Sequence, residues 1–132
     1  MPFERSPIDI FLGALNMVAL PLVRGEDSED MRETAQFYGF EDFGDHFKNV
    51  SPRVTELVVF PPSPSEPACV LTLTTPNFLL PGAFTRAAAR WAKSQTMTRE
   101  GPRRWRNTGL VFTLEISRSG GRTNLRCVLA PV

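Results

Sequence analysis

A run of basic side chains between positions 86 and 106 is the group of residues in this sequence best suited to bind another molecule. The seven cations stand against a single acid, Glu100. They are Arg86, Arg90, Lys93, Arg99, Arg103, Arg104 and Arg106. Guanidinium groups bind phosphates and carboxylates through forked hydrogen bonds, and the indole of Trp105 offers a plane on which a nucleobase can stack. The pattern predicts a surface for an anionic partner, either a nucleic acid or the acidic face of another protein subunit; the alternative is a solvated or internally neutralised surface with Trp105 in the core.

A second candidate site surrounds His46, the only histidine of the chain, which lies close to Asp42 and Asp45. A carboxylate beside a histidine can orient the ring and tune its pKa towards neutrality for acid–base catalysis. A metal site needs three or four converging ligands, and the chain has no second histidine to supply one. We therefore expect a solvated acidic loop with no metal ion and no cofactor, and keep catalysis by His46 with Asp42 or Asp45 as an alternative.

The two cysteines, Cys69 and Cys127, lie in apolar, strand-like runs where cysteine behaves as a small buried hydrophobe. Two free, inert thiols are expected, because apolar surroundings raise the pKa of a thiol. The first residues show no convincing export signal, since Glu4 interrupts the basic start and no small-residue cleavage site follows the apolar run. These features favour an intracellular protein, cytoplasmic or nuclear.

Charge is segregated along the chain although the net charge is only +1. Residues 1–82 carry 5 basic and 12 acidic side chains, whereas residues 83–132 carry 10 basic and 2 acidic side chains. The length of 132 residues fits one globular domain, residues 1–132. Its two halves can neutralise each other locally, present a basic surface to a polyanion, or associate acidic side to basic side between subunits.

The first fifty residues are predicted to be mainly helical. Ser6-Pro7 followed by Asp9 is typical of a helix start, so a helix is expected over residues 7–20. Its apolar residues cover most of its circumference, which indicates burial inside the domain or against a second copy. The residues proposed for a homo-oligomer contact are Ile8, Phe11, Leu12, Leu15 and Leu22. Polar residues interrupt this run, so no membrane span is expected.

A second helix is expected over residues 28–39, and the aromatic spacing of residues 40–47 predicts a short, broken helix at best. Strands are expected over residues 54–60 and 69–75, joined by a proline-rich loop. An amphipathic helix then begins near residue 81, with its apolar side chains on one face and the first three cations on the other, and an arginine-rich loop follows.

The last segment predicts a β-hairpin over residues 110–117 and 123–130, with Gly120-Gly121 as its two-residue turn. This register sorts apolar and polar residues onto opposite faces. The apolar pairs are Ile116 with Leu125, Leu114 with Cys127, and Phe112 with Leu129, and the outer pairs are Ser117 with Asn124, Glu115 with Arg126, and Thr113 with Val128.

Together these elements predict an α+β domain, in which N-terminal helices precede a β-β-α-β-β antiparallel sheet with helices packed on one face. The favoured hypothesis is a non-enzymatic binding or assembly protein whose basic second half engages an anionic partner. One alternative is a small pocket protein or enzyme with the cone-shaped sheet of nuclear-transport-factor-like domains, using His46. Another is a protein-binding adaptor without affinity for nucleic acid.

Overall fold

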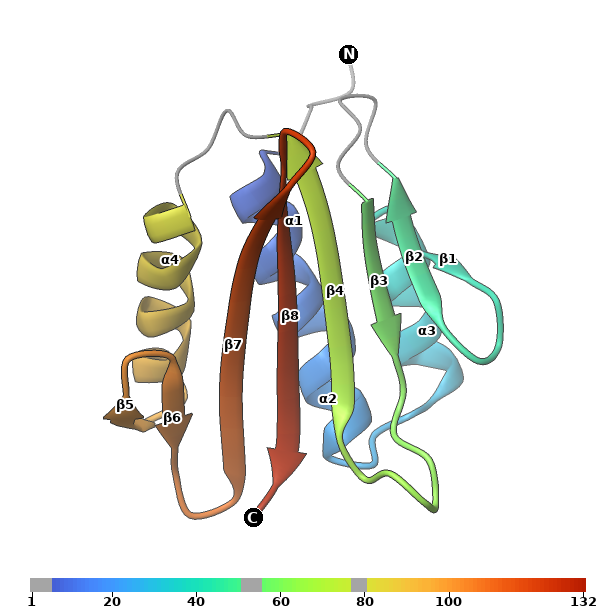
Figure 1. The fold of residues 1–132 in the computed structure, drawn as a ribbon. Coiled ribbons are helices and arrows are strands. Elements are labelled where there is room, and N and C mark those ends of the chain that lie inside the picture. The colour runs from blue at the N-terminus through green and yellow to red at the C-terminus, as the bar shows by residue number, and fades with distance from the viewer. Residues whose placement is uncertain (1–5, 51–55, 77–80) are drawn as a thin grey trace.

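The computed structural model describes residues 6–50, 56–76 and 81–132. Its helices are α1 (Pro7–Ala14), η1 (Leu15–Ala19), α2 (Leu20–Val23), α3 (Glu29–Phe37) and α4 (Pro81–Ser94). Its strands are β1 (Glu41–Asp42), β2 (Phe47–Val50), β3 (Glu56–Phe60), β4 (Cys69–Pro76), β5 (Thr98–Gly101), β6 (Arg104–Arg106), β7 (Leu110–Ser119) and β8 (Arg122–Pro131). The strands form one eight-stranded sheet in the order β1-β2-β3-β4-β8-β7-β6-β5, with every pair antiparallel (Figure 1).

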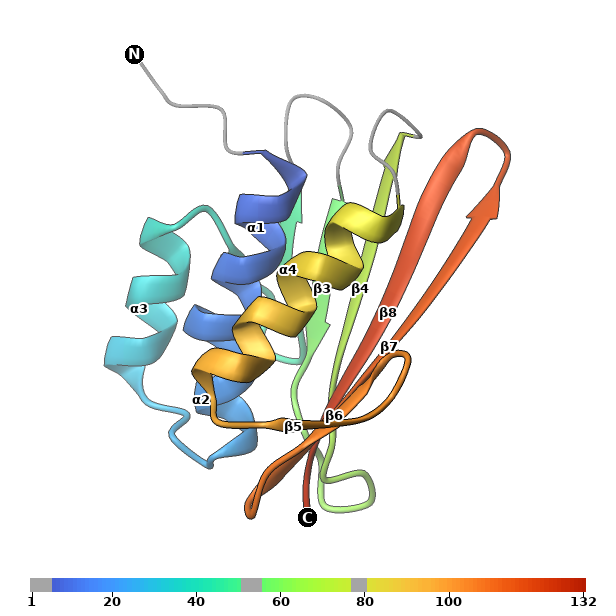
Figure 2. The ribbon, with the colours of Figure 1, turned by 90° about the vertical axis from the view of Figure 1, so that its left-hand side faces the viewer.

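The helices form a single layer against one face of this sheet, with α1 between α3 and α4 (Figures 1 and 2). The predicted α+β class is therefore confirmed. The predicted β-β-α-β-β order is present as β3, β4, α4, β7 and β8, and the β1–β2 and β5–β6 hairpins extend the sheet at its two ends. Among the described residues, no helix has the length and apolarity to span a membrane.

The predicted first helix is present and continues as α1, η1 and α2. Ser6 caps it, because its Oγ accepts the N–H of Asp9 at 3.1 Å. Phe11 is 0% exposed and Leu15 is 1% exposed, so the helix is buried within its own chain. Leu22 is buried as well, and Ile8 and Leu12 pack partly buried against the same core. The surface proposed for a homo-oligomer contact is thus the core of the domain itself, and the intramolecular alternative is the one that the structure shows.

The expected broken helix over residues 40–47 is wrong, because this segment forms the β1–β2 hairpin. Gly44 lies in its turn with φ 87°, a conformation that favours glycine. Phe40 and Phe47 enter the core while Phe43 is 51% exposed. The three-residue and four-residue spacing of these aromatics therefore comes from the turn of a hairpin and not from a helical face.

The predicted C-terminal hairpin is confirmed in full. Ser119 pairs with Arg122 across a two-residue turn, and all six predicted pairs occur in the register of β7 with β8. Gly120 and Gly121 have φ 58° and 74°, the positive values that such a tight turn needs. β4 pairs with β8 on the other side, which places the hairpin at the centre of the sheet.

Both thiols are free and buried, as predicted, with Cys69 and Cys127 each 1% exposed. Burial raises the pKa of the Cys69 thiol to about 12, and it also raises the pKa of Cys127. Since the thiolate is the reactive species, neither side chain is prepared for nucleophilic chemistry.

We expect both thiols to resist an aromatic disulfide reagent at pH 8 while the protein is folded, and to react within seconds in denaturant. The release of the coloured thiol product measures the rate. A Ser119→Cys variant, which adds a thiol at an exposed turn position, is the control and should react at once with one equivalent. Rapid reaction of the unmodified folded chain would contradict the burial of Cys69 and Cys127.

Candidate anion-binding surface

The buried face of α4 fixes the direction of its basic side chains. Phe84 is 0% exposed and meets the ring of Phe11 edge-on at 5.9 Å. Trp91 is also buried, and its Nε1 donates a hydrogen bond to Asn16 Oδ1 at 2.9 Å. With these contacts locking the rotation of the helix, the opposite face projects into solvent. The exposed cations on that face are Arg86, Arg90 and Lys93, as predicted.

These three side chains form a row on the outer surface of the helical layer. Arg86 and Lys93 are seven residues apart along α4, or about 10 Å at the rise of an α-helix. No ion pair joins any of the three to a described acidic side chain. The row is therefore a line of unneutralised charge on a rigid element.

The remaining four cations lie on the β5–β6 hairpin, which replaces the arginine-rich loop expected from the sequence. Trp105 anchors this hairpin, since it is 3% exposed and stacks on Phe112 with ring centroids 5.5 Å apart. The indole of Trp105 therefore lies in the core, as in the alternative prediction. It offers no exposed plane on which a nucleobase could stack.

Burial of Trp105 sends its two neighbours to the other face of the sheet, because successive strand residues alternate. Arg104 pairs with Thr113 and Arg106 pairs with Val111, both outward-facing positions of β7. Glu100 Oε1 lies 3.2 Å from Arg104 Nε and 3.4 Å from Arg106 Nε. These two arginines are exposed but share one carboxylate.

The last two basic residues occupy the turn and edge of the same hairpin. Arg99 donates from Nε to the carbonyl of Gly101 and from Nη2 to that of Pro102, both at 2.9 Å. Arg103 lies in the turn and is exposed. All seven predicted cations are therefore exposed, but they divide between the outer face of α4, the sheet edge and the uncovered sheet face.

The fold places acidic and basic residues at opposite ends of the sheet. α4 and the β5–β6 hairpin lie at one end, and α3 and β1 lie at the other (Figure 1). Eight acids gather in residues 26–45, against Arg32 as the only cation. They are Glu26, Asp27, Glu29, Asp30, Glu33, Glu41, Asp42 and Asp45. The acids of residues 26–45 and the cations of α4 and the β5–β6 hairpin are therefore separated by the central strands.

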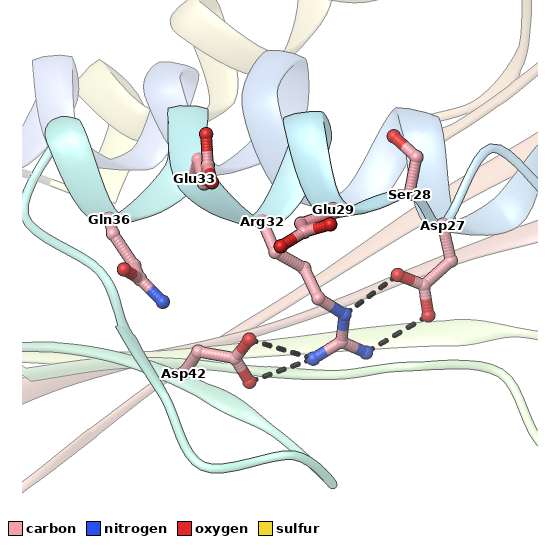
Figure 3. A pocket seen from close by; sticks show the side chains of 7 residues that line it. All are labelled: Asp27, Ser28, Glu29, Arg32, Glu33, Gln36 and Asp42. Carbon is pink, nitrogen blue, oxygen red and sulfur yellow. Dashed lines mark hydrogen bonds and ion pairs between the residues drawn. The ribbon is translucent and has the colours of Figure 1, made fainter.

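The carboxylate of Asp42 belongs to a group of ion pairs around Arg32, here called the arginine clamp (Figure 3). Arg32 Nη1 contacts the two carboxylate oxygens of Asp42 at 2.7 and 2.9 Å, and its Nε and Nη2 donate to Asp27 at 2.7 and 2.9 Å. The Gly44 N–H donates to Asp42 Oδ1 at 2.8 Å. Hydrogen bonds from Arg32, followed by the one from Gly44, lower the pKa of Asp42.

The clamp lines a shallow depression of about 500 Å³ between α3 and β1 (Figure 3). Its guanidinium group is already occupied by two carboxylates and lies 5.0 Å from the centre of the Phe47 ring. Arg32 was not among the predicted site residues. No local sequence pattern predicts its ion pairs, since its partners are five and ten residues away. Its arrangement indicates a structural role in tying α3 to the first hairpin.

Among the described residues, Asp45 is the one carboxylate bonded to His46, with Nδ1 and Oδ1 2.7 Å apart. Asp45 is 87% exposed, so solvent screens this pair. The imidazole stacks on Phe43 with centroids 4.8 Å apart and an interplanar angle of 8°, and the ring of Phe60 lies at 6.1 Å. In the part of the chain that the structure describes, no three potential metal ligands converge.

Comparison of the chain with models of protein families, with curated proteins and with solved structures finds no match in any of the three.

Proposed function

We propose that the protein is a non-enzymatic binding protein that holds the phosphate backbone of a nucleic acid against α4 and the turn of the β5–β6 hairpin. The observation that supports this most directly is the row formed by Arg86, Arg90 and Lys93, which is exposed and has no described acidic partner. Like charges four residues apart, such as Arg86 and Arg90, destabilise a helix by about 0.2–0.5 kcal/mol. An anionic partner relieves this repulsion.

The burial of the aromatic side chains in this region favours contacts to phosphate over contacts to bases. Phe84, Trp91 and Trp105 are all buried, so the described residues of α4 and of the hairpin expose no aromatic ring. Arginine and lysine bind phosphate oxygens mainly through charge, which carries little information about base sequence. The proposed binding is therefore steeply dependent on salt and tolerant of sequence.

Replacing Arg86, Arg90 and Lys93 together with glutamine is expected to weaken binding to a duplex oligonucleotide by roughly 500-fold near 0.1 M salt. Three phosphate contacts contribute about 0.9 each to the slope of log affinity against log salt concentration, so the slope should fall by about 2.7. Fluorescence anisotropy of a labelled oligonucleotide, measured at several salt concentrations, gives both quantities.

Two control variants isolate the surface. Arg24→Gln removes an exposed arginine next to the acidic segment, and His46→Ala removes the candidate acid–base residue; both should bind as the unmodified chain does. If the unmodified chain binds no oligonucleotide at low salt, the proposal fails. Binding to polyglutamate alone, abolished by the same three substitutions, would identify an acidic protein as the partner.

A further inference from the structure

The helices cover only one face of the sheet, and no described helix or strand lies against the other (Figure 2). The centre of this uncovered face is mainly apolar. Its outward-facing side chains on β3, β4, β7 and β8 are Val58, Phe60, Val70, Thr72, Val111, Thr113, Val128 and Ala130. Phe60 is 45% exposed, and charged residues border the apolar centre, an arrangement typical of protein interfaces.

One cross-strand row of this face has an order that suits pairing with itself. The registers align Phe60 on β3, Val70 on β4, Val128 on β8, Thr113 on β7 and Arg104 on β6. Val128 is at the centre of this row, with two strands on each side. One end carries an aromatic ring and the other carries a guanidinium group.

We propose that the uncovered face binds a second copy of this chain, around a two-fold axis that runs parallel to β8 between the two copies and passes over Val128. Such a rotation places the strands on one side of β8 opposite the strands on the other side of β8 in the second copy. Each cross-strand row stays at the same height along the strands. It places Val128 against its counterpart and Val70 against Thr113. Phe60 of each copy then lies under Arg104 of the other, where a cation is attracted by the face of an aromatic ring.

The neighbouring row adds charge complementarity. Arg126 pairs in register with Glu115, but the two form no ion pair within the chain. Dimerisation brings two arginines and two glutamates together near the axis, so that Arg126 of each copy can reach Glu115 of the other. The four charges sum to zero, and the repulsion between the two arginines is offset by two new contacts.

The face is large enough for a specific interface. The strands β3, β4, β8, β7 and β6 have 5, 8, 10, 10 and 3 residues, and at about 3.3 Å by 4.8 Å for each residue they present roughly 580 Å² per copy. Two copies together bury roughly 1,150 Å², which exceeds the roughly 1,000 Å² expected of a biological interface. An axis parallel to β8 keeps the two β8 strands parallel, within the about 30° that aligned sheet packing allows.

The test is the mass of the protein in solution, measured by sedimentation equilibrium up to millimolar concentration. The unmodified chain should approach twice its monomer mass of 14.7 kDa. Val128→Asp places two carboxylates face to face on the axis and should give a monomer with unchanged circular dichroism. Val132→Asp, at an exposed position outside the face, is the matched control and should remain dimeric.

Substitutions at Phe60 and Arg104 test the same dimer independently if Val128→Asp disturbs folding. Phe60→Lys sets a lysine against Arg104 of the other copy and should weaken the dimer at least tenfold, whereas adding Arg104→Glu to the same chain should restore it. The α4 glutamine variant should dimerise normally, so failure of the dimer and failure of nucleic-acid binding are distinguishable. A monomer at every concentration, or a dimer indifferent to both the Val128 and Phe60 substitutions, would overturn the inference.

Discussion

Replacing Phe112 with alanine is expected to lower the free energy of unfolding by about 4 kcal/mol, within the 3–5 kcal/mol typical of buried phenylalanine. Phe112 is 0% exposed, and its ring contacts both tryptophans of the chain. Trp91 of α4 meets it at 5.0 Å and Trp105 of β6 meets it at 5.5 Å. Truncation therefore leaves a cavity beneath the two elements that carry the basic surface.

Urea unfolding followed by circular dichroism measures this loss, with tryptophan fluorescence as a second probe that reports directly on Trp91 and Trp105. A domain of this size is typically stable by about 5–15 kcal/mol, so the variant should remain folded in the absence of urea. Phe37→Ala is the matched control, because it deletes the same atoms at a site that is 84% exposed. It should change stability by about 0.5 kcal/mol or less. Equal losses for the two variants would contradict the central position of Phe112.

The packing lost in Phe112→Ala is also expected to affect the proposed binding surface. Phe112 supports α4 through Trp91 and β6 through Trp105, and these elements position Arg90 and Arg104 at separate sites. Since the direction of Arg86, Arg90 and Lys93 depends on the rotation of α4, looser packing of Trp91 should reduce the proposed oligonucleotide affinity even where the variant is fully folded. The rigidity of the surface and the stability of the core thus have the same origin.

The central hairpin could be predicted residue by residue because its two strands are long and locally consistent. Each strand has ten residues, residues 112–117 and 124–127 alternate between apolar and polar types, and two glycines define the turn. A shift of one residue would expose the entire apolar set, so a single register satisfies the sequence. The caps at Ser6 and Ser28 were predictable for a similar reason, since each hydrogen bond joins residues three apart.

The two outer hairpins could not be predicted in this way. β1 has 2 residues and β6 has 3, too few to show a period. Phe47 and Trp105 are buried, but strands this short give no pattern from which that burial can be predicted. The exposure of the seven basic residues could likewise be predicted from the sequence. Their division between the outer face of α4, the sheet edge and the uncovered sheet face could not, because the register of β6 with β7 decides where Arg104 and Arg106 point.

Replacing Arg32 with methionine is expected to cost about 2 kcal/mol of stability at neutral pH, within the range for hydrogen bonds to charged groups. Asp42 contributes most of this loss, because its side chain is only 15% exposed, whereas that of Asp27 is 45% exposed and better screened by solvent. Methionine retains much of the length of the arginine side chain but lacks the guanidinium group that lies over the ring of Phe47. The substitution therefore tests the charge and the forked hydrogen bonds more than the packing.

The pH dependence separates this clamp from a packing effect. Arg32 lowers the pKa of Asp42 in the folded state, first through its hydrogen bonds, and it lowers the pKa of Asp27 in the same way. The resulting stability is fully present above the unfolded pKa of about 4 and is lost as pH falls through the lower folded values. The difference between the unmodified chain and Arg32→Met should thus be constant from pH 7 to about pH 5 and shrink below about pH 4.

Urea unfolding at a series of pH values between neutrality and about pH 2.5 measures this difference, with Arg24→Met as a control that removes a nearby exposed arginine. The control should follow the unmodified chain at every pH. A loss for Arg32→Met that persists unchanged in acid would mean that the side chain acts through packing alone. If instead the difference disappears as Asp42 becomes protonated, the ion pairs are what holds α3 against the first hairpin, and the acids around Arg32 have a structural reason to gather at the end of the sheet opposite the basic surface.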